Sequence, residues 1–271
     1  MDPETIVNRE STPLSQHYEG RLTERDRLRR REGQLEFERT RELLLRFLPN
    51  TPAKIIDIGG GMGAYAQWLA SLGYDVHLVD LVPVHVEEAA RIGTFTAAVG
   101  DARALDEPAE SHDVALLLGP AYHLQEAEDR SKVFREAARV VRQGGLIVAG
   151  FISRGAVALD GYVKGWIDQP GALGTMRDQL RQGFKENEGS GFSAISYFHL
   201  PSEARRELKS SGLKVMAMFG IEGPGWIAPD FDLRWKQTET RETMLETARY
   251  CEDVPELQVL SAHLLAVCRH A

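Results

Sequence analysis

Between residues 54 and 152, short apolar stretches alternate with longer stretches in which apolar residues recur at helical spacing. The short stretches are apolar throughout, which is typical of parallel strands covered by helices on both faces. The predicted strands cover residues 54–58, 74–81, 95–99, 114–118 and 146–152, and the predicted helices cover 65–72, 83–91 and 129–142. This alternation predicts an α/β fold built on a doubly wound, mostly parallel sheet.

The two ends of the chain depart from this alternation. Charged residues dominate 21–46, and we expect residues 1–49 to form a helical N-terminal cap. Residues 50–271 are expected to form the main domain, with a lid inserted at about 154–200, where glycine and charge interrupt the pattern. Beyond the lid, the sequence predicts helices at 201–211 and 238–251 and strands at 213–221 and 260–268.

Composition excludes several classes of protein. Of the 271 residues, 43% are hydrophobic, so the chain can bury a substantial core, and the net charge of −8 argues against a nucleic-acid platform. Cys251 and Cys268 form no CxxC motif, which indicates a reducing cytoplasmic setting and no metal site. Residues 1–10 lack the apolar core of a signal peptide, and no apolar run is long enough to span a membrane.

The first predicted strand ends in the glycine-rich turn Asp57-Ile58-Gly59-Gly60-Gly61-Met62-Gly63. Such a turn lets the backbone approach a ligand closely, and the helix that follows points its free N–H groups at the ligand. Two ligand classes compete for it. Gly59, Gly61 and Ala64 satisfy the dinucleotide pattern G-x-G-x-x-G/A, and Asp80, at the end of the second strand, can hold ribose hydroxyls in either class.

Three features favour S-adenosylmethionine (SAM) over a dinucleotide. Asp57, directly before the glycines, suits the cationic amino group of a methionine moiety and is badly placed beside a pyrophosphate. Asp101, in Gly100-Asp101-Ala102 after the third strand, can accept a hydrogen bond from an adenine amino group. The first strand begins only at residue 54, whereas a dinucleotide domain often opens near the N-terminus.

Taken together, these segments resemble the class I SAM-dependent methyltransferase family, over about residues 50–152. The matching segments are Ile55 to Gly63, Val79-Asp80, Gly100-Asp101-Ala102, Leu118-Gly119-Pro120-Ala121-Tyr122-His123-Leu124 and Arg142-Gln143-Gly144-Gly145. The segment after the fourth strand, with Leu-Glu-Phe-Glu-Arg-Thr near the N-terminus, is similar to a bacterial branch that methylates small molecules.

The resemblance implies a Rossmann-like fold that ends in an antiparallel hairpin, with strands near Leu213 and His263. It implies that SAM is the cofactor, S-adenosylhomocysteine the product and a small molecule the methyl acceptor. The residues that it implies for the cofactor are Asp57, Gly59, Gly61, Gly63, Asp80, Leu81, Asp101, Ala102, Leu118 and Gly119.

Methyl transfer from a sulfonium is an in-line displacement that depends mainly on alignment, and a general base helps when the acceptor must lose a proton. His123, after the fourth strand at the carboxyl edge of the sheet, is the candidate base, with lining of the pocket as the alternative role. Tyr18, Tyr122 and Trp226 are candidate substrate contacts. His263 alternates with apolar neighbours in a terminal strand and is expected to be structural.

Three other functions stay open. The arginines between residues 21 and 46 suggest an RNA methyltransferase, but neighbouring acids nearly balance them, and a solvated helix face with i,i+4 ion pairs is the favoured interpretation. The pattern at Gly59 suggests an NAD-dependent oxidoreductase, but no Tyr-x-x-x-Lys pair accompanies it. A non-catalytic SAM-binding protein is the third, because methyl transfer needs no fixed catalytic residue.

Overall fold

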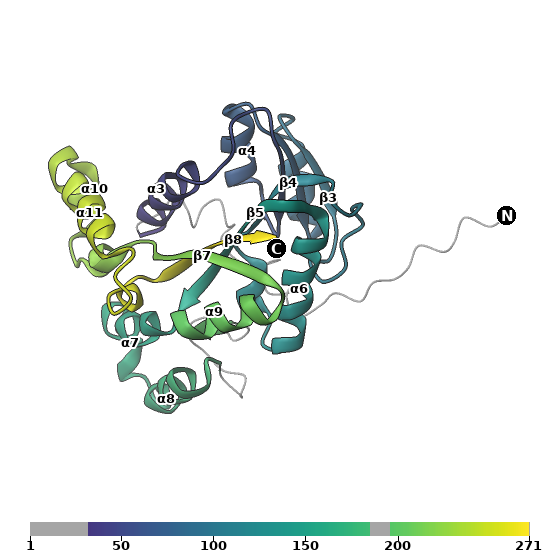
Figure 1. Ribbon diagram of the computed structural model, residues 1–271. Helices are drawn as coiled ribbons and strands as arrows, with labels where there is room; N and C mark the ends of the chain where they lie inside the picture. The colour runs from purple at the N-terminus through teal and green to yellow at the C-terminus, as the bar shows by residue number, and fades with distance from the viewer. Residues whose placement is uncertain (1–31, 185–195, 271) are drawn as a thin grey trace.

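The computed structural model describes residues 32–184 and 196–270. One sheet of eight strands forms the centre of the molecule (Figure 1). The strands are β1 (Lys54–Ile58), β2 (Asp75–Asp80), β3 (Thr96–Val99), β4 (His112–Leu117), β5 (Val141–Ser153), β6 (Phe198–His199), β7 (Leu213–Gly220) and β8 (His263–His270). The helices are α3 (Glu32–Leu45), α4 (Ala64–Ser71), α5 (Pro83–Ala90), α6 (Ala127–Val140), α7 (Arg154–Val163), α8 (Ala172–Gln182), α9 (Pro201–Ser210), α10 (Phe231–Lys236) and α11 (Thr238–Cys251). Four short 3-10 helices complete the described elements: η1 (Pro120–His123), η2 (Trp166–Asp168), η3 (Gly223–Ile227) and η4 (Gln258–Leu260).

The strand order is β3-β2-β1-β4-β5-β8-β7, with β6 paired to the end of β5. Strands β1 to β5 are parallel, whereas β8 runs antiparallel to both β5 and β7. The chain order reverses between β1 and β4, and in open α/β sheets ligands bind in the crevice outside the strand ends at this point. The doubly wound, mostly parallel sheet predicted from the sequence is confirmed.

Alternation along the central strands divides the core into two layers. Ile56 faces a cluster that includes residues of α6 and α9, and its neighbour Ile55 faces a cluster that includes residues of α3, α4 and α5. Successive side chains of a strand point to opposite faces, so an apolar run such as Lys54–Ile58 can fill both layers. Figure 1 shows α3 and α4 on one side of the sheet and α6 and α9 on the other.

The predicted antiparallel C-terminal pair is present as β7 and β8, but it is not a tight hairpin. Residues 221–262 separate the two strands and contain η3, α10, α11 and η4. Helices α10 and α11 lie beside α3, at one side of the molecule (Figure 1). The predicted helix at 238–251 coincides with α11, whereas α10, η3 and the short β6 were not predicted.

The predicted cap and lid correspond to separate helical elements. In the predicted cap of residues 1–49, the described part holds α3. In the predicted lid, α7, η2 and α8 follow β5, and their side chains pack around Tyr122 and Phe198. Within residues 32–184 and 196–270, no helix combines the length and the apolar character needed to cross a bilayer.

Candidate functional site

The glycine turn after β1 adopts a conformation that requires glycine. Gly59 and Gly61 have positive φ angles of 70° and 56°, which side chains with a Cβ rarely adopt. A Cβ on Gly59 would lie 2.8 Å from Cδ of Pro120, and a Cβ on Gly60 would lie 2.6 Å from Oδ2 of Asp57. The turn therefore packs its backbone directly against the end of β4 and against Asp57. Gly63, with φ of 81°, forms the N-cap of α4.

Asp57 is a buried acid at the end of β1, with 1% of its surface exposed. Among the described residues, nothing donates a hydrogen bond to its Oδ2 atom. Burial, helped by the nearby charge of Asp80, raises the pKa of Asp57 to about 7. A ligand ammonium group would donate a hydrogen bond to Oδ2, and its positive charge would stabilise the ionised carboxylate.

Asp80, at the end of β2, holds the turn in place. Its Oδ2 accepts the Gly61 backbone N–H at 2.8 Å, and its Oδ1 accepts the Val82 backbone N–H at 2.9 Å. A carboxylate has about four acceptor positions, so it keeps capacity for ligand hydroxyl groups. The same side chain thus shapes the glycine turn and keeps acceptor capacity at the cavity, and its contact with a ribose stays a prediction.

Asp101, after β3, is paired within the protein. Its carboxylate accepts from the backbone N–H of Arg103 at 2.9 Å and from the Arg103 guanidinium at 2.8 Å. The guanidinium also binds Asp129 at 2.9 Å. Burial would raise the pKa of Asp101, but the hydrogen bonds and charge of Arg103 outweigh burial and hold the pKa below its ordinary value. Asp101 therefore stays ionised, and the hydrogen bonds from Arg103 fix the orientation of its carboxylate.

A cavity of about 400 Å³ joins these groups. It opens along the carboxyl ends of the parallel strands, and α3 contributes Glu36 and Thr40 to its wall. The predicted cofactor residues that line it are Asp57, Gly59, Gly61, Asp80, Leu81, Asp101, Ala102, Leu118 and Gly119. Gly63 lies in the same turn but outside the lining. Residues predicted from separate motifs therefore meet at one cavity.

These observations fit bound SAM. The glycine turn leaves room where a Cβ would clash, and the orphaned buried Oδ2 of Asp57 suits an ammonium group. Acids at the ends of β2 and β3 lie further along the same cavity wall.

Tyr122 and His123 also line the cavity, from η1 after β4. The centroids of their rings lie 4.7 Å apart. Tyr122 is buried among Ile152 and Phe198, and its carbonyl oxygen accepts the backbone N–H of Tyr197 at 2.8 Å. The structure thus places the candidate base at the pocket, and its role as a base stays a prediction.

The other two predicted substrate residues are not part of this lining. Tyr18 lies outside the described residues. Trp226, on η3, is buried between Ala156 and Ala262, and its indole N–H donates to the carbonyl oxygen of Leu260 at 2.8 Å. Its packing is that of a core side chain, and contact with a substrate stays a prediction.

Sequence reasoning missed the wall of the cavity that comes from α3 and β8. His263 lines the cavity, whereas it was expected to be structural. Its Nδ1 atom lies 2.6 Å from Glu222 Oε1 and 3.7 Å from Glu36 Oε2. Glu36 belongs to the Leu-Glu-Phe-Glu-Arg-Thr segment, which was the only available signal. Glu222 follows β7 and belongs to no motif.

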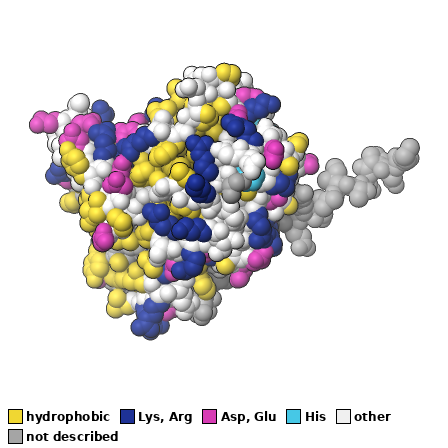
Figure 2. All heavy atoms as spheres, viewed as in Figure 1, with side chains coloured by type: hydrophobic (Ala, Val, Ile, Leu, Met, Phe, Trp, Pro, Cys, Tyr) yellow, Lys and Arg dark blue, Asp and Glu magenta, His cyan; other side chains and the backbone are white. Residues whose placement is uncertain are grey.

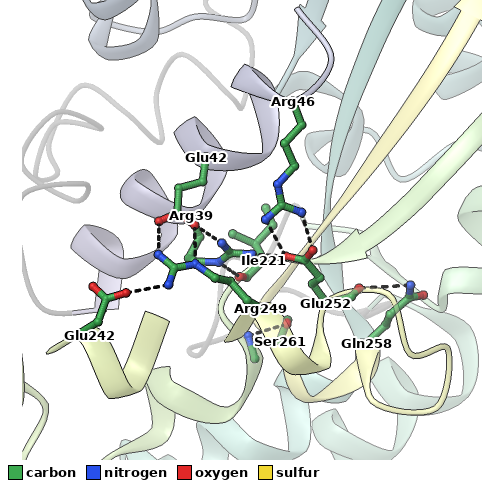
Figure 3. Close-up of polar contacts among 10 residues, drawn as sticks. Arg39, Glu42, Arg46, Ile221, Glu242, Arg249, Glu252, Gln258 and Ser261 are labelled. Atoms are coloured by element: carbon green, nitrogen blue, oxygen red, sulfur yellow. Dashed lines mark hydrogen bonds and ion pairs between the residues drawn. The ribbon is translucent and has the colours of Figure 1, made fainter. Parts of the chain in front are cut away.

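An ion-pair network holds α3 against the C-terminal segment (Figure 3). The fully buried Arg39 donates to Glu252, to Glu42 and to the carbonyl oxygen of Ile221, the last at 3.3 Å. Arg46 also binds Glu252, and Arg249 of α11 binds Glu42 at 2.7 Å. The prediction of a solvated helix face is therefore wrong for Arg39, because this side chain is fully buried and pairs with Glu252, which is distant in the sequence.

Comparisons with known proteins concern the fold and the domain type. Residues 55–145 match the family described as methyltransferase domain. No curated protein sequence matches the chain. A SAM-dependent methyltransferase from Methanosarcina mazei has 16% identity, with 84% of this chain and 96% of that chain covered and a TM-score of 0.57.

Two further solved structures have the same architecture. A chain from the complex between the Haloferax volcanii Trm112 methyltransferase activator and a methyltransferase has 16% identity, covers 88% of this chain and 92% of its own length, and gives a TM-score of 0.56. Geranyl diphosphate methyltransferase in complex with GPP and sinefungin has 16% identity, with 88% of this chain and 80% of that chain covered and a TM-score of 0.54. At such identities the likeness shows the fold.

Proposed function

We propose that the chain is a SAM-dependent methyltransferase that transfers a methyl group from SAM to a small-molecule acceptor, since residues 55–145 match a methyltransferase domain and the fold is that of SAM-dependent methyltransferases. The observation that carries this proposal is the cavity, whose lining includes Tyr122, His123, Glu36 and His263 in addition to the predicted cofactor residues. A volume of about 400 Å³ lies within the range of small-ligand pockets.

Each cofactor residue has a role that follows from its environment. Asp57 would bind the amino group of SAM, because its buried carboxylate needs a cation. Asp80 would bind the ribose hydroxyls while it holds Gly61. Asp101, kept ionised by Arg103, would accept the adenine amino group beside Ala102. Bound SAM supplies a methyl group on a sulfonium, whose leaving group is a neutral thioether.

The described arginines on and directly after α3 weaken the case for RNA as the acceptor. Arg39 and Arg46 pair with Glu252, and Arg41 stacks over Phe37 and Trp68. Figure 2 shows basic side chains interspersed with hydrophobic and acidic ones on the visible face. Phosphate binding depends on Lys and Arg that are available to neutralise it, and pairing within the protein reduces that supply. A small-molecule acceptor accounts better for the cavity.

Isothermal titration calorimetry with SAM and S-adenosylhomocysteine tests the cofactor. We expect both to bind, and no heat of binding at millimolar ligand would sink the proposal. A fluorescence titration with NADH in place of SAM should show no tight binding, and tight binding would favour an oxidoreductase.

A panel of small metabolites with methyl-labelled SAM tests the reaction. We expect labelled product with at least one acceptor. SAM binding without transfer to any acceptor, including structured RNA, would favour a non-catalytic SAM-binding protein. Transfer to RNA alone, with salt-sensitive binding, would favour an RNA methyltransferase.

A further inference from the structure

His263 is held at the cavity by the sheet rather than by a loop. It is the first residue of β8, where it pairs with Ile152 of β5, and its carbonyl oxygen accepts the backbone N–H of Ile221 at 3.0 Å. The imidazole therefore lines the cavity from a rigid position between two strands. Groups that take part in proton transfer work best when rigid elements fix them in this way.

A buried carboxylate fixes the orientation of this imidazole. Glu222 has 1% of its surface exposed, and its Oε2 accepts the His263 backbone N–H at 3.0 Å. Its Oε1 lies 2.6 Å from His263 Nδ1, which is a hydrogen-bond distance. An ionised carboxylate only accepts hydrogen bonds, so the ring proton belongs on Nδ1. In the neutral ring, Nε2 then carries the lone pair.

We propose that His263 is the general base of methyl transfer, and that Glu222 is the positioning residue that sets its tautomer. The inference rests on the proposed function and names the acceptor class: a hydroxyl or amine that loses a proton when it is methylated. The acceptor X–H gives its proton to Nε2 of His263, while the X–H electron pair stays on X. X bonds the methyl carbon, and the C–S pair leaves with the sulfur. The products are X–CH₃, the neutral thioether and an imidazolium.

The described surroundings of the ring favour this role. Glu222 and Glu36 are the described acids with an oxygen within 4.0 Å of a His263 ring nitrogen, and both stabilise the imidazolium that forms. Glu36 also lines the cavity from α3, so it can attract an acceptor that carries a positive charge. His123 also lines the cavity and packs against the Tyr122 ring, whereas His263 has a buried carboxylate at its Nδ1 atom.

The same three side chains have the composition of a metal site. Glu36, Glu222 and His263 offer one ligand atom each, all within 4.8 Å of one another. However, both oxygens of Glu222 accept hydrogen bonds from His263, one from the ring and one from the backbone. These two hydrogen bonds orient the imidazole, and they occupy the carboxylate oxygens that a cation would need. Metal binding is therefore an outcome of the test rather than the proposal.

Nitrogen NMR of protein with ¹⁵N-labelled histidine, saturated with S-adenosylhomocysteine, tests the dyad without any acceptor. We expect the neutral His263 ring to carry its proton on Nδ1, and Glu222→Gln to shift or broaden this signal. His270→Asn, on the same strand and outside the cavity lining, is the control and should leave the His263 signal unchanged. A neutral ring protonated on Nε2 would overturn the proposal.

Methyl transfer to an acceptor found in the panel tests the chemistry. His263→Asn should lower kcat by about 10²–10⁴-fold and remove the acidic limb of the pH–rate profile, with the affinity for S-adenosylhomocysteine changed by less than about threefold. Glu222→Gln should lower kcat less, and Glu222→Asp should restore part of it. His270→Asn should behave as the unaltered chain.

Three results would overturn the inference while leaving the proposed function standing. One is an unchanged kcat in His263→Asn. Another is a loss of S-adenosylhomocysteine affinity that accounts for the whole defect, since His263 would then be a cofactor ligand. The third is calorimetric binding of Zn²⁺ or Mn²⁺ that both His263→Asn and Glu36→Gln abolish. Failure of S-adenosylhomocysteine to bind the unaltered chain would instead overturn the proposed function.

Discussion

The two walls of the cavity are built in different ways. The cofactor wall is the part of the lining formed by Asp57, the glycine turn and Asp80. Its contacts join residues that are close in the sequence, such as the Gly61–Asp80 hydrogen bond, which spans 19 residues. The α3–β8 wall is the part of the lining that contains Glu36 and His263. Here Glu222 and His263 are 41 residues apart in the sequence, and the Arg39–Glu252 pair that holds α3 spans 213 residues. Consecutive βα units form the cofactor wall, whereas the α3–β8 wall forms only when α3 packs against the C-terminal segment.

This difference predicts that damage to α3 mainly affects stability, while damage to the glycine turn mainly affects cofactor affinity. Substitutions on α3 and in the glycine turn, and the titration of Asp57, test that division.

Arg39→Met should lower the free energy of unfolding by about 3–5 kcal/mol, because it leaves the buried Glu252 without the buried guanidinium partner of Arg39. Urea unfolding followed by circular dichroism measures this change. Arg41→Met, on the same helix with a 3.3 Å pair to Glu38, is the matched control and should cost less than about 1 kcal/mol. If both variants lost the same free energy of unfolding, the ion pairs of Arg39 would contribute nothing specific to stability.

Asp80→Ala should weaken SAM binding about 100-fold, because the cofactor loses charged hydrogen bonds and the turn loses the anchor of Gly61. Calorimetry measures the affinity, and thermal unfolding without ligand should show a moderate fall in Tm. Asp75→Ala, at the exposed start of the same strand, is the control. Unchanged affinity in Asp80→Ala would mean that the cofactor wall is misassigned.

Gly60→Ala should weaken SAM binding by about 10–100-fold, because its Cβ would meet Asp57 Oδ2 at 2.6 Å and displace the turn. Gly174→Ala in α8, where nothing lies within 4 Å of the added Cβ, should bind SAM normally. Equal affinities for the two variants would show that the turn tolerates a side chain.

SAM affinity should fall about tenfold per pH unit below pH 7, because the pKa of Asp57 is raised to about 7 and the ammonium needs the ionised form. Calorimetry in buffers of different ionisation enthalpy should detect proton release on binding near pH 6. Asp57→Asn should bind SAM weakly and lose this pH dependence. A flat affinity profile in the unaltered chain would contradict the role of Asp57.

The same raised pKa affects the unliganded protein with a definite sign. The folded pKa of Asp57 exceeds its ordinary value, so the folded state holds the proton more tightly than the unfolded state. Its contribution to stability is full below the ordinary pKa of 3.8 and is lost as the pH rises through about 7. Asp57→Asn should therefore stabilise the unliganded protein at pH 8, on the order of a few kcal/mol at most.

The sequence predicted the regular elements where one local signal dominates. The strand at 54–58 and the helix at 238–251 coincide with β1 and α11, because an apolar run with terminal glycines and a helical period are both local properties. The missed elements depend on distant partners. The two residues of β6 become a strand only by pairing with Ile152 and Ser153, and no local pattern announces so short a segment.

The candidate site divides along the same line. The sequence by itself determined that Asp57, the glycines and Asp80 meet at one cavity, because these residues lie at the ends of parallel strands and the parallel sheet brings those ends to one edge. Only the tertiary structure decided that His263 lines the cavity and that Glu222 binds its ring. Their meeting depends on β8 entering the sheet beside β7, and the buried pairing of Arg39 with Glu252 holds α3, which brings Glu36 to the same cavity.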